Sequence, residues 1–312
     1  MSKITLLGAS GAMGKSIAEA LRKEGEPYRV VARGKSSLQA AFGGDPQAEI
    51  VTWDLDNPES VRAALRGSGT LIYLVGTPYD QFRLHPGMMK TTLAGAKAEG
   101  VERIFLINTV YPYGMPQTTP VKESHPREPH TFKGRMRKEQ EDLVMAAAAR
   151  GELQYTILRL PDFYGPGVEK SFLQGLFSAA VKGGFAKMLG PIDTPHEFVY
   201  VPDVGPVVTA MIRNPGTWGR AWNLAGGGVT TTRAMVDLAY RITGRKPRLL
   251  LAGKTMLRMM GVFDPVMREL VEMNYLLTNP VLLDESDLRG LIGPIARTSY
   301  EDGIRATVEA VR

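Results

Sequence analysis

The sequence predicts an α/β fold with a doubly wound parallel β-sheet and a smaller C-terminal region. Short apolar runs alternate with segments of helical periodicity through the first half of the chain, which is the order expected of a sheet with helices on both faces. Several of these runs are apolar without interruption, as in strands that are buried on both sides. The chain has 312 residues, enough for two modest domains or one elaborate domain.

The first strand–helix unit lies at the start of the chain. Residues 4–7 are mostly apolar and end in a glycine-rich turn, and residues 28–32 form the second predicted strand. Between them, Ile17 and Leu21 fall on one face of a helix predicted over residues 15–23. We therefore expect two parallel strands joined by a helix.

The third strand and the helix after it carry local end signals. The strand is predicted at residues 50–53. Pro58 stands where a helix would begin, and Glu59 lies three positions after Asp56. A proline in the first turn removes no intrahelical hydrogen bond, and an acid just before it accepts free backbone amides. We therefore expect Asp56 to cap this helix.

Three more strands complete the predicted sheet. They lie at residues 71–75, 104–107 and 153–160, and the first two are continuous apolar runs typical of buried parallel strands. Helical periodicity at residues 88–99 and 134–150 connects them. Six strands in alternation with helices are enough for a doubly wound sheet.

Composition excludes several classes of protein. The chain has no Cys and only four His, so we expect no disulfide and no metal site. The net charge of +6 is spread along the chain, without the basic stripe of a nucleic-acid reader. No apolar run reaches the roughly 18 residues of a membrane span, and no signal peptide is expected. The expectation is a cytoplasmic protein whose partner is a small molecule, with no nucleic acid and no membrane.

The turn after the first strand carries Gly8, Gly11 and Gly14. Between a strand and a helix, one glycine permits a tight turn, a second lets the backbone approach a pyrophosphate, and the last lets the helix pack on the strand. The helix N-terminus then offers free N–H groups and partial positive charge to phosphates. The pattern predicts dinucleotide binding; a tight turn without a ligand is the alternative.

The end of the second strand favours NADP over NAD. An NAD enzyme places an acid there for the ribose hydroxyls, whereas this chain has Arg33, with Lys35 and Ser36 close behind it. A guanidinium binds a 2′-phosphate through charge-assisted hydrogen bonds. The alternative is a solvated loop cation. Asp54, after the third strand, is expected either to bind the adenine amino group or to be an ordinary surface acid.

Several motifs follow one another in an order typical of one known family. They are the glycine turn, Asp54-Leu55, Asn108-Thr109, Tyr113-Gly114, the segments 159–167 and 198–204, and Trp222-Asn223-Leu224-Ala225-Gly226. In these the sequence resembles the extended short-chain dehydrogenase/reductases, the NAD-dependent epimerase/dehydratase group, over most of its length. The resemblance implies a Rossmann fold and a nicotinamide cofactor.

The resemblance also implies a domain division and a cofactor site. A Rossmann domain is expected over residues 1–165, to which residues 198–223 return, and a substrate-binding region over residues 166–312. The residues expected at the cofactor are Gly8, Ser10, Gly11, Ala12, Met13, Gly14, Arg33, Asp54, Leu55, Gly76, Thr77, Pro161 and Phe163. In the second region, Met256, Met259, Met260, Met267 and Met273 are expected to fill core gaps, with a lid over a ligand as the alternative.

The catalytic positions depart from the family pattern. The family uses a Ser or Thr after the fifth strand, matched here by Thr109, and then a Tyr followed four residues later by a Lys. Lys133 and Arg137 stand at the latter two positions, and no Tyr lies between Tyr113 and Tyr155. The resemblance therefore implies that the usual phenol is replaced.

Two interpretations of Lys133 remain open. Lys133 and Arg137 share a helix face, so charge repulsion and burial beneath a cofactor would both lower the pKa of Lys133 into the range of a usable acid or base. The segment also resembles an atypical branch that includes isoflavone reductase-like enzymes, in which a lysine is catalytic. Alternatively, Lys133 is a solvated cation at the start of a helix.

The sequence thus predicts an NADP-dependent oxidoreductase that acts on a small carbonyl or enone. In this hypothesis Thr109 polarises the substrate oxygen, Lys133 moves the proton and Arg137 orients the nicotinamide ribose. The alternatives are a non-catalytic NADP-binding sensor or regulatory protein and a sugar-nucleotide epimerase or dehydratase. The chain is expected to be a monomer or a homodimer. His196 has no carboxylate or Cys partner at metal or triad spacing, so it is expected to be a surface or substrate-pocket His.

Overall fold

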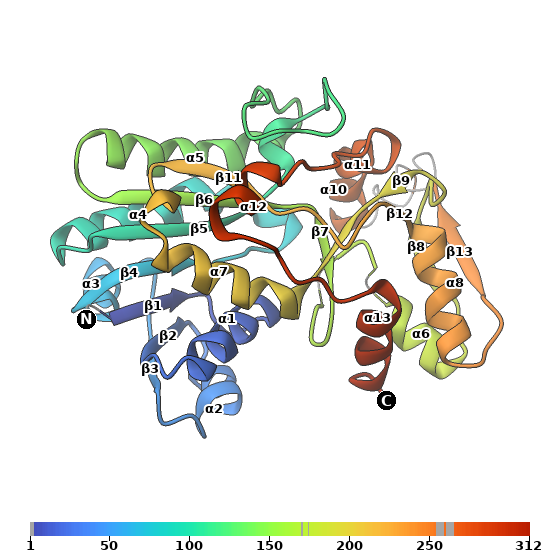
Figure 1. Cartoon of the computed structure of the whole chain (residues 1–312), viewed down its shortest axis with the longest axis horizontal. Helices are drawn as coiled ribbons and strands as arrows, with labels where there is room; N and C mark the ends of the chain where they lie inside the picture. The colour runs from blue at the N-terminus through green and yellow to red at the C-terminus, as the bar shows by residue number, and fades with distance from the viewer. Residues whose placement is uncertain (1–2, 170, 174, 254–258, 260–264) are drawn as a thin grey trace.

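The computed structural model describes residues 3–169, 171–173, 175–253, 259 and 265–312. Its centre is a seven-stranded sheet in the order β11-β6-β5-β4-β1-β2-β3, with every neighbouring pair parallel. The strands are β1 (Lys3–Leu7), β2 (Tyr28–Ala32), β3 (Ala48–Thr52), β4 (Ser68–Tyr73), β5 (Arg103–Thr109), β6 (Gln154–Leu160) and β11 (Arg220–Asn223). The predicted doubly wound α/β fold is confirmed (Figure 1).

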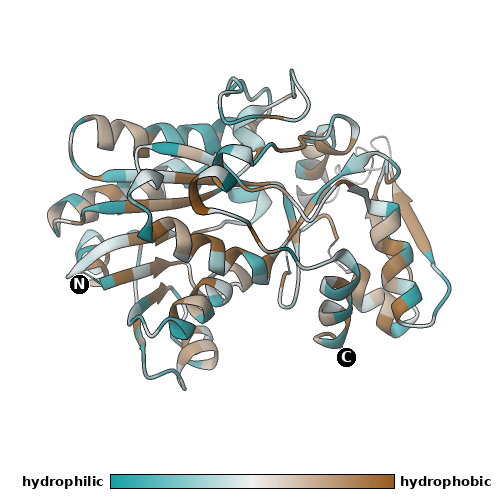
Figure 2. Ribbon diagram, viewed as in Figure 1, coloured by the Kyte–Doolittle hydropathy of each residue, from teal (hydrophilic) through white to brown (hydrophobic). Residues whose placement is uncertain are grey.

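Helices cover both faces of the sheet, and each face has its own buried apolar cluster. One face packs against α1 (Ala12–Lys23), α2 (Lys35–Phe42), α7 (Val204–Arg213) and α12 (Ser286–Ile292). The other packs against α3 (Pro58–Leu65), α4 (Leu84–Ala98) and α5 (Phe132–Ala149). Figure 2 shows hydrophobic residues along the central strands and polar residues on the outer helical surfaces. The double-sided burial explains the uninterrupted apolar runs.

The cap of α3 is a correction to the sequence analysis. Asn57, not Asp56, occupies the N-cap, and its side-chain oxygen accepts hydrogen bonds from the amides of Glu59 and Ser60 at 3.1 and 3.3 Å. Pro58 directly follows the cap, at the first helical position. An N-cap side chain must lie within reach of amides two and three residues on, and Asp56 is one residue too early.

A second region lies beside the carboxyl edge of the sheet (Figure 1). Its described part contains three two-stranded sheets: β7 (Asp162–Tyr164) with β10 (Phe198–Tyr200), β8 (Ala186–Leu189) with β13 (Leu249–Ala252), and β9 (Pro195–His196) with β12 (Thr230–Thr231). Its helices are α6 (Leu176–Lys182), α8 (Thr232–Ile242), α10 (Pro265–Met273), α11 (Tyr275–Thr278) and α13 (Tyr300–Glu309). Among the described residues, four short 3-10 helices connect elements: η1 (Tyr79–Gln81), η2 (Tyr111–Tyr113), η3 (Val201–Asp203) and η4 (Pro215–Thr217). The region has a buried cluster of its own.

The chain crosses between the two regions more than once. After β10 it returns to the main sheet, where α7 packs against α1 and β11 pairs with β6. The packing of α7 is close: the hydroxyl of Ser16 donates to the carbonyl of Val201 at 2.9 Å and accepts from the amide of Gly205 at 3.0 Å. Because the strands are parallel, the carboxyl ends of β1, β4, β5 and β6 lie at one edge of the sheet, the edge beside the second region (Figure 1).

Two further expectations concern the methionines of the second region and membrane-spanning helices. Met273 is fully buried, as expected of a core residue, whereas Met259 is 63% exposed. Met256 and Met260 lie outside the described residues, as does the side chain of Met267. No helix in the described ranges has the length and apolarity needed to cross a membrane.

Candidate active site

The three glycines of the first turn have distinct surroundings. Gly8 has φ +83°, and a Cβ atom on it would lie 2.9 Å from the amide nitrogen of Val75. A Cβ on Gly14 would overlap the carbonyl oxygen of Ala9. By contrast, a Cβ on Gly11 would meet nothing within 4 Å. The close packing of strand and helix therefore leaves no room for a side chain at Gly8 or Gly14, whereas Gly11 borders open space.

The N-terminus of α1 is arranged to receive an anion. Gly11 is its N-cap, no side chain of the described residues caps it, and its first turn contains no acid. The first amides of the helix consequently have no intrahelical acceptor and carry the positive end of the helix dipole. A pyrophosphate fits this cradle, since it supplies the missing acceptors and opposite charge.

A hollow of about 480 Å³ opens beside this turn. Seven of the residues expected at the cofactor line it: Gly8, Ser10, Arg33, Asp54, Leu55, Gly76 and Thr77. Ala12 and Met13 lie in the first turn of α1, directly after the lining residues Gly8 and Ser10 in the sequence. The side chain of Met13 packs partly against the core. Trp53 and Ser37, which were not expected at the cofactor, also line the hollow. Residues of this kind carry no sequence signal beyond their nearness to a strand end.

Arg33 and Asp54 lie at the rim of the hollow. Arg33 is exposed, and it makes no ion pair with any described residue. Ser37, rather than the expected Ser36, shares the lining with it. Asp54 is exposed as well, and its carboxylate accepts the amide of Asp56 at 3.0 Å. Both charged side chains can therefore reach a ligand in the hollow.

His85 lies directly behind Thr77. Its Nε2 is 3.1 Å from the Thr77 hydroxyl, and its Nδ1 is buried without a hydrogen-bond partner among the described residues. Burial, aided by the positive charge of Arg137, lowers the pKa of His85 to about 2. The imidazole is therefore neutral at physiological pH, and it supports Thr77 as an uncharged hydrogen-bond partner.

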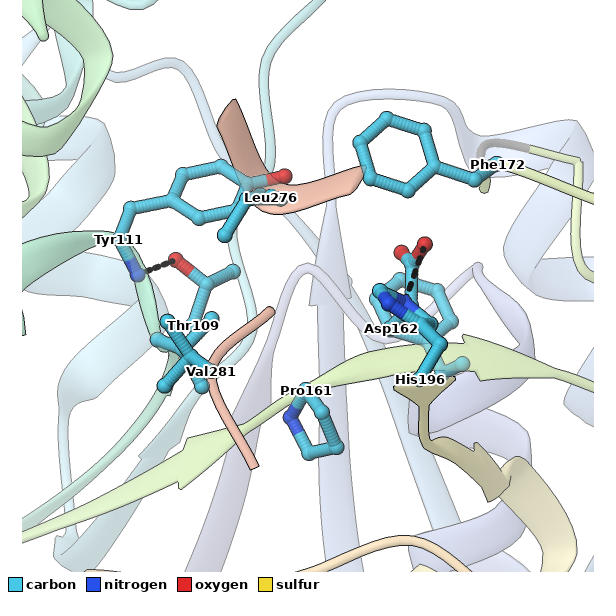
Figure 3. A pocket seen from close by; sticks show the side chains of 10 residues that line it. Thr109, Tyr111, Pro161, Asp162, Phe172, His196, Leu276 and Val281 are labelled. Carbon is cyan, nitrogen blue, oxygen red and sulfur yellow. Dashed lines mark hydrogen bonds and ion pairs between the residues drawn. The ribbon is translucent and has the colours of Figure 1, made fainter. Parts of the chain in front are cut away.

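A second, smaller pocket lies at the carboxyl ends of β5 and β6 (Figure 3). Its free volume is about 20 Å³, comparable to one water-sized group. Thr109, Pro161 and Phe163, three of the expected site residues, line it. The other lining residues are Val110, Tyr111, Asp162, Phe172, His196, Leu276 and Val281. We call this the Thr109 pocket.

Two phenols meet on one side of the Thr109 pocket. The hydroxyl oxygens of Tyr79 and Tyr111 are 3.2 Å apart, and the amide of Tyr111 donates to the hydroxyl of Thr109 at 3.4 Å. Burial raises the pKa of Tyr79 to about 12 and the pKa of Tyr111 well above its ordinary value. Both phenols are therefore protonated and can donate hydrogen bonds.

Tyr113 serves a structural network instead. Its hydroxyl donates to Asn223 at 2.7 Å and accepts from the guanidinium of Arg159 at 2.9 Å. Arg159 also donates to both oxygens of Glu141, at 2.9 and 2.7 Å. Arg159 and Glu141 are both buried, so this network ties α5 to β6 and β11 beneath the site.

Lys133 lies under α10 and does not line the Thr109 pocket. It is fully buried, its ammonium pairs with Glu269, and it lies 3.7 Å from Glu272. The ammonium is also 5.8 Å from the ring centres of Tyr79 and Phe82. Lys133 is therefore not a solvated cation, as the alternative interpretation expected. Two glutamates of α10 provide the negative charge beside it.

Arg137 lies one turn further along α5. Its guanidinium donates to Gln140 at 2.8 Å and lies 5.6 Å from the ring centre of Phe82. Burial lowers the pKa of Arg137. Its Nε atom is buried without a partner among the described residues. Arg137 is not part of the lining of either pocket.

His196 lines the Thr109 pocket, one of the two positions expected for it, and a carboxylate lies beside it. Its Nε2 lies 3.7 Å from Oδ2 of Asp162 (Figure 3). The two residues are brought together by β7 and β9, which belong to different two-stranded sheets. Their separation along the chain hides the pair from sequence analysis, although Asp162 stands just after the strand predicted at residues 153–160.

No cluster of His, Asp and Glu suited to a metal ion occurs in the part of the chain that the structure describes.

Comparison with known proteins gives a consistent family match. The model of the "NAD dependent epimerase/dehydratase family" matches residues 4–225. Subunit 9 of the NADH dehydrogenase [ubiquinone] 1 alpha subcomplex, mitochondrial, from Arabidopsis thaliana is 24% identical over 254 residues, covering 78% of this chain. This chain spans only 58% of the length of that protein.

A reductase and a solved structure are also similar. A ceramide reductase of Caulobacter vibrioides is 25% identical over 255 residues, which cover 79% of this chain and 72% of that protein. The crystal structure of UDP-glucuronic acid 4-epimerase from Bacillus cereus in complex with NAD has a TM-score of 0.81 at 16% identity, and the match covers 99% of this chain and 98% of the epimerase. At 16% identity, the similarity shows that the two proteins share a fold.

Proposed function

Because the chain belongs to the NAD dependent epimerase/dehydratase family, a family of enzymes, we propose that it is an NADP-dependent oxidoreductase acting on a small carbonyl or enone. One observation carries this proposal: the Thr109 pocket and the hollow beside the glycine turn open at neighbouring strand ends, since β4 pairs with β5. A dinucleotide in the hollow can thus extend toward a substrate in the pocket. The domain division proposed for it is residues 1–165 with 198–223, and residues 166–312.

The cofactor fits the residues present. Gly11 leaves open space at the free amides of α1, and the lining of the hollow supplies further polar groups. The first turn of α1 would hold the pyrophosphate, Asp54 and Leu55 the adenine side, and Pro161 and Phe163 the nicotinamide side. A nicotinamide cofactor bound there supplies the hydride.

NADP rather than NAD is the proposed cofactor. The support is Arg33, an exposed cation at the rim of the hollow that makes no ion pair with a described residue. Ser37 adds a hydroxyl in the same lining. A 2′-phosphate would pair with both groups, whereas the two hydroxyls of an NAD ribose would leave the guanidinium charge unmatched.

Thr109 is proposed to polarise the substrate oxygen, Lys133 to supply the proton and Arg137 to orient the nicotinamide ribose. The support for Lys133 is its burial and its position 5.8 Å from the ring centre of Tyr79. Since the phenol of Tyr79 meets that of Tyr111 at the pocket, the proposed route of the proton runs through this pair. The ion pairs with α10 favour the second candidate, a non-catalytic NADP-binding sensor.

The proposed substrate is a compact molecule rather than a sugar nucleotide. The Thr109 pocket is small, and the carboxylate of Asp162 lines it, so a diphosphate there would meet like charge. The similarity to a ceramide reductase supports reduction of a carbonyl compound. The protein is proposed to act as a monomer or homodimer on this small molecule, without nucleic acid or membrane.

The test combines cofactor binding with turnover. NADPH and NADH are titrated by fluorescence, and a panel of ketones, aldehydes and enones is then offered with NADPH while its absorbance is followed. The proposal expects tighter binding of NADPH and substrate-dependent oxidation with at least one carbonyl class. Binding of NADPH without oxidation by any compound would favour the sensor, and failure to bind either dinucleotide would overturn both candidates.

A further inference from the structure

The two-stranded sheet of β8 and β13 has one buried and one exposed face. Its register pairs Lys187 of β8 with Leu250 of β13, and successive side chains of a strand point to opposite faces. Ala186 and Met188 point inward and are buried in the apolar cluster of the second region. The opposite face, which we call the β8–β13 face, carries four exposed side chains on the strands or directly before them: Phe185, Lys187, Arg248 and Leu250.

Apolar and cationic side chains are mixed on the β8–β13 face. Phe185 and Leu250 are 49% and 51% exposed, and Leu251 beside them is 46% exposed. The guanidinium carbon of Arg248 lies 4.5 Å from the ring centre of Phe185, within the range of a cation–π contact. Several large apolar side chains that are exposed together mark an interaction surface, and here cations stand among them.

The helix ends and the loop beside this face add four exposed cations: Lys182, Arg241, Arg245 and Lys246. The turn at Gly183 holds two arginines next to the face. Arg248 donates to the carbonyl oxygen of Gly183 at 3.3 Å, and a Cβ atom on Gly183 would lie 2.7 Å from Nη1 of Arg245. The cations therefore gather around one turn and one face.

No acid balances these cations. Residues 175–192 and 238–253 contain six Lys and Arg and no Asp or Glu, and none of the six forms an ion pair with a described residue. The net charge of the whole chain is +6, so all other residues together are neutral. The pairing of β8 with β13 brings the two stretches together. The expectation that the positive charge is spread along the chain is therefore wrong for the folded protein.

The β8–β13 face lies at the end of the second region that is farthest from the central sheet (Figure 1). Figure 2 shows β13 as a hydrophobic strand that follows a hydrophilic loop. No residue of the face lines the Thr109 pocket or the hollow beside the glycine turn. The face is thus separate from the candidate active site.

This combination of groups fits the surface of an anionic membrane. Acidic lipid headgroups attract Lys and Arg side chains, and the boundary between headgroups and acyl chains accepts Phe and Leu. A nucleic acid matches the charge, but it offers Leu250 and Leu251 no apolar surroundings. A second copy of the chain brings like charges together.

We infer that the β8–β13 face docks the protein on an anionic lipid bilayer, with its cations at the headgroups and Phe185 and Leu250 at the acyl boundary. No membrane was expected from the sequence because no apolar run is long enough to span a bilayer, but contact with a bilayer surface needs no such run. Docking goes beyond the proposed reaction, which itself needs no membrane, and it would hold the protein at the bilayer surface.

Co-sedimentation with vesicles measures docking. The protein is mixed with vesicles of phosphatidylcholine alone, or with vesicles in which about a third of the lipid is phosphatidylserine, at physiological ionic strength. We expect affinity for the anionic vesicles to be about tenfold higher or more, and to fall several-fold when the salt concentration is doubled, because salt screens the attraction. Equal affinity for the two kinds of vesicle, or sedimentation with neither, overturns the inference.

Charge reversal tests the cations. The double variant Arg245→Glu, Lys246→Glu is expected to lower affinity for the anionic vesicles about tenfold or more. The matched control is Lys90→Glu, Lys97→Glu, which changes the net charge equally at two exposed positions of α4. Thermal melting and NADPH titration check that both variants are folded. Equal losses in the two double variants would show that only the net charge matters, and the docking face would be refuted.

A second pair of variants tests the apolar contact. Leu250→Ser is expected to weaken vesicle binding several-fold, whereas Val229→Ser, at an exposed position outside the face, leaves it unchanged. Polyglutamate and duplex DNA are offered in place of vesicles. If either binds as tightly as the vesicles do, and equally to Leu250→Ser, the face belongs to an acidic macromolecule and the inference fails. Selective vesicle binding that both Leu250→Ser and the Arg245 and Lys246 reversal weaken supports docking, whether or not a carbonyl compound is turned over.

Discussion

Lys133 donates its backbone amide to Oε1 of Glu272 at 2.6 Å, and its ammonium lies 3.7 Å from Oε2 of the same carboxylate. Glu269 pairs with the ammonium from the preceding turn of α10. One residue at the start of α5 is thus held twice by α10. Glu269 and Glu272 can be replaced by neutral glutamines together with Lys133. Such variants separate a structural role of the lysine in these ion pairs from a chemical role in the reaction.

Lys133→Met is expected to abolish NADPH oxidation while leaving NADPH affinity almost unchanged. The substitution alone leaves two carboxylates without their buried cation, which destabilises the fold by about 3–5 kcal/mol. The triple variant Lys133→Met, Glu269→Gln, Glu272→Gln removes that charge imbalance and is expected to regain stability without regaining turnover. Single-turnover absorbance and thermal melting measure the two effects. Recovery of turnover in the triple variant would mean that Lys133 is only a structural partner.

Thr109→Val is expected to lower kcat by about a hundredfold, since it removes one hydrogen-bond donor to the developing negative charge. Thr156→Val is the control: Thr156 lies on β6, is buried and donates to the carbonyl of Thr217 at 3.0 Å. It is expected to reduce stability without a comparable effect on kcat. Steady-state kinetics with the best carbonyl substrate measures the difference, and equal kcat values for the two variants would contradict the role of Thr109.

Arg33→Ala is expected to weaken NADPH binding by about tenfold to a hundredfold, which corresponds to the loss of a charged hydrogen bond. Binding of NADH is expected to change by less than about threefold, because it has no 2′-phosphate. Lys35→Ala, two residues away and outside the lining of the hollow, serves as the matched control. Fluorescence titration gives both dissociation constants. An equal loss of affinity for NADPH and NADH would show that Arg33 does not bind the 2′-phosphate.

The glycines of the first turn allow a matched comparison. Gly11→Ala adds a methyl group that meets no described atom within 4 Å, so the fold is expected to stay stable while dinucleotide affinity falls. Gly14→Ala forces a methyl group against the carbonyl of Ala9, so stability is expected to fall by about 1–3 kcal/mol. Melting and titration of the two variants test the contrast. Tight dinucleotide binding by a stable Gly11→Ala protein would argue against pyrophosphate at α1.

We expect Glu197 to cause a loss of stability as the pH rises from acid to neutral. It is 4% exposed, it accepts amides from Gly226 and Leu283 at 3.1 and 2.8 Å, and burial raises its pKa to about 7. A raised carboxyl pKa means that the folded state binds the proton more tightly, so stability falls as pH rises from the ordinary range of a Glu through about 7.

The measurement is urea unfolding of wild-type and Glu197→Gln protein at several values between pH 5 and pH 8. The variant cannot ionise there, so its stability relative to the wild type is expected to improve across the range by up to about 3 kcal/mol. Parallel pH profiles would show that the Glu197 carboxylate is accommodated without cost.

The sheet and the glycine turn were predictable because their signals are local. Strands buried on both faces are apolar throughout, and Gly8, Gly11 and Gly14 stand within one turn. Even so, the cap of α3 moved from Asp56 to Asn57, because either side chain suits a cap and only the backbone decides which one reaches the amides.

The pocket was less predictable because its contacts join distant segments. Asp162 meets His196 through two short strands in separate sheets, and Lys133 meets Glu269 and Glu272 more than a hundred residues later. Ion pairs of this kind depend on tertiary packing and leave no periodicity in the sequence. The phenol pair of Tyr79 and Tyr111 is of the same type, since η1 and η2 follow neighbouring strands.

The return of the chain to its first sheet has a consequence for biosynthesis. The helix α7 covers apolar residues of α1 such as Ile17 and Leu21, and β11 closes the edge of the sheet beside β6. On a ribosome both elements emerge only after the whole excursion through β7 to β10. Until about residue 223 has left the exit tunnel, the nascent chain exposes this face of α1 and the hydrogen-bonding edge of β6, both of which favour contacts with other chains.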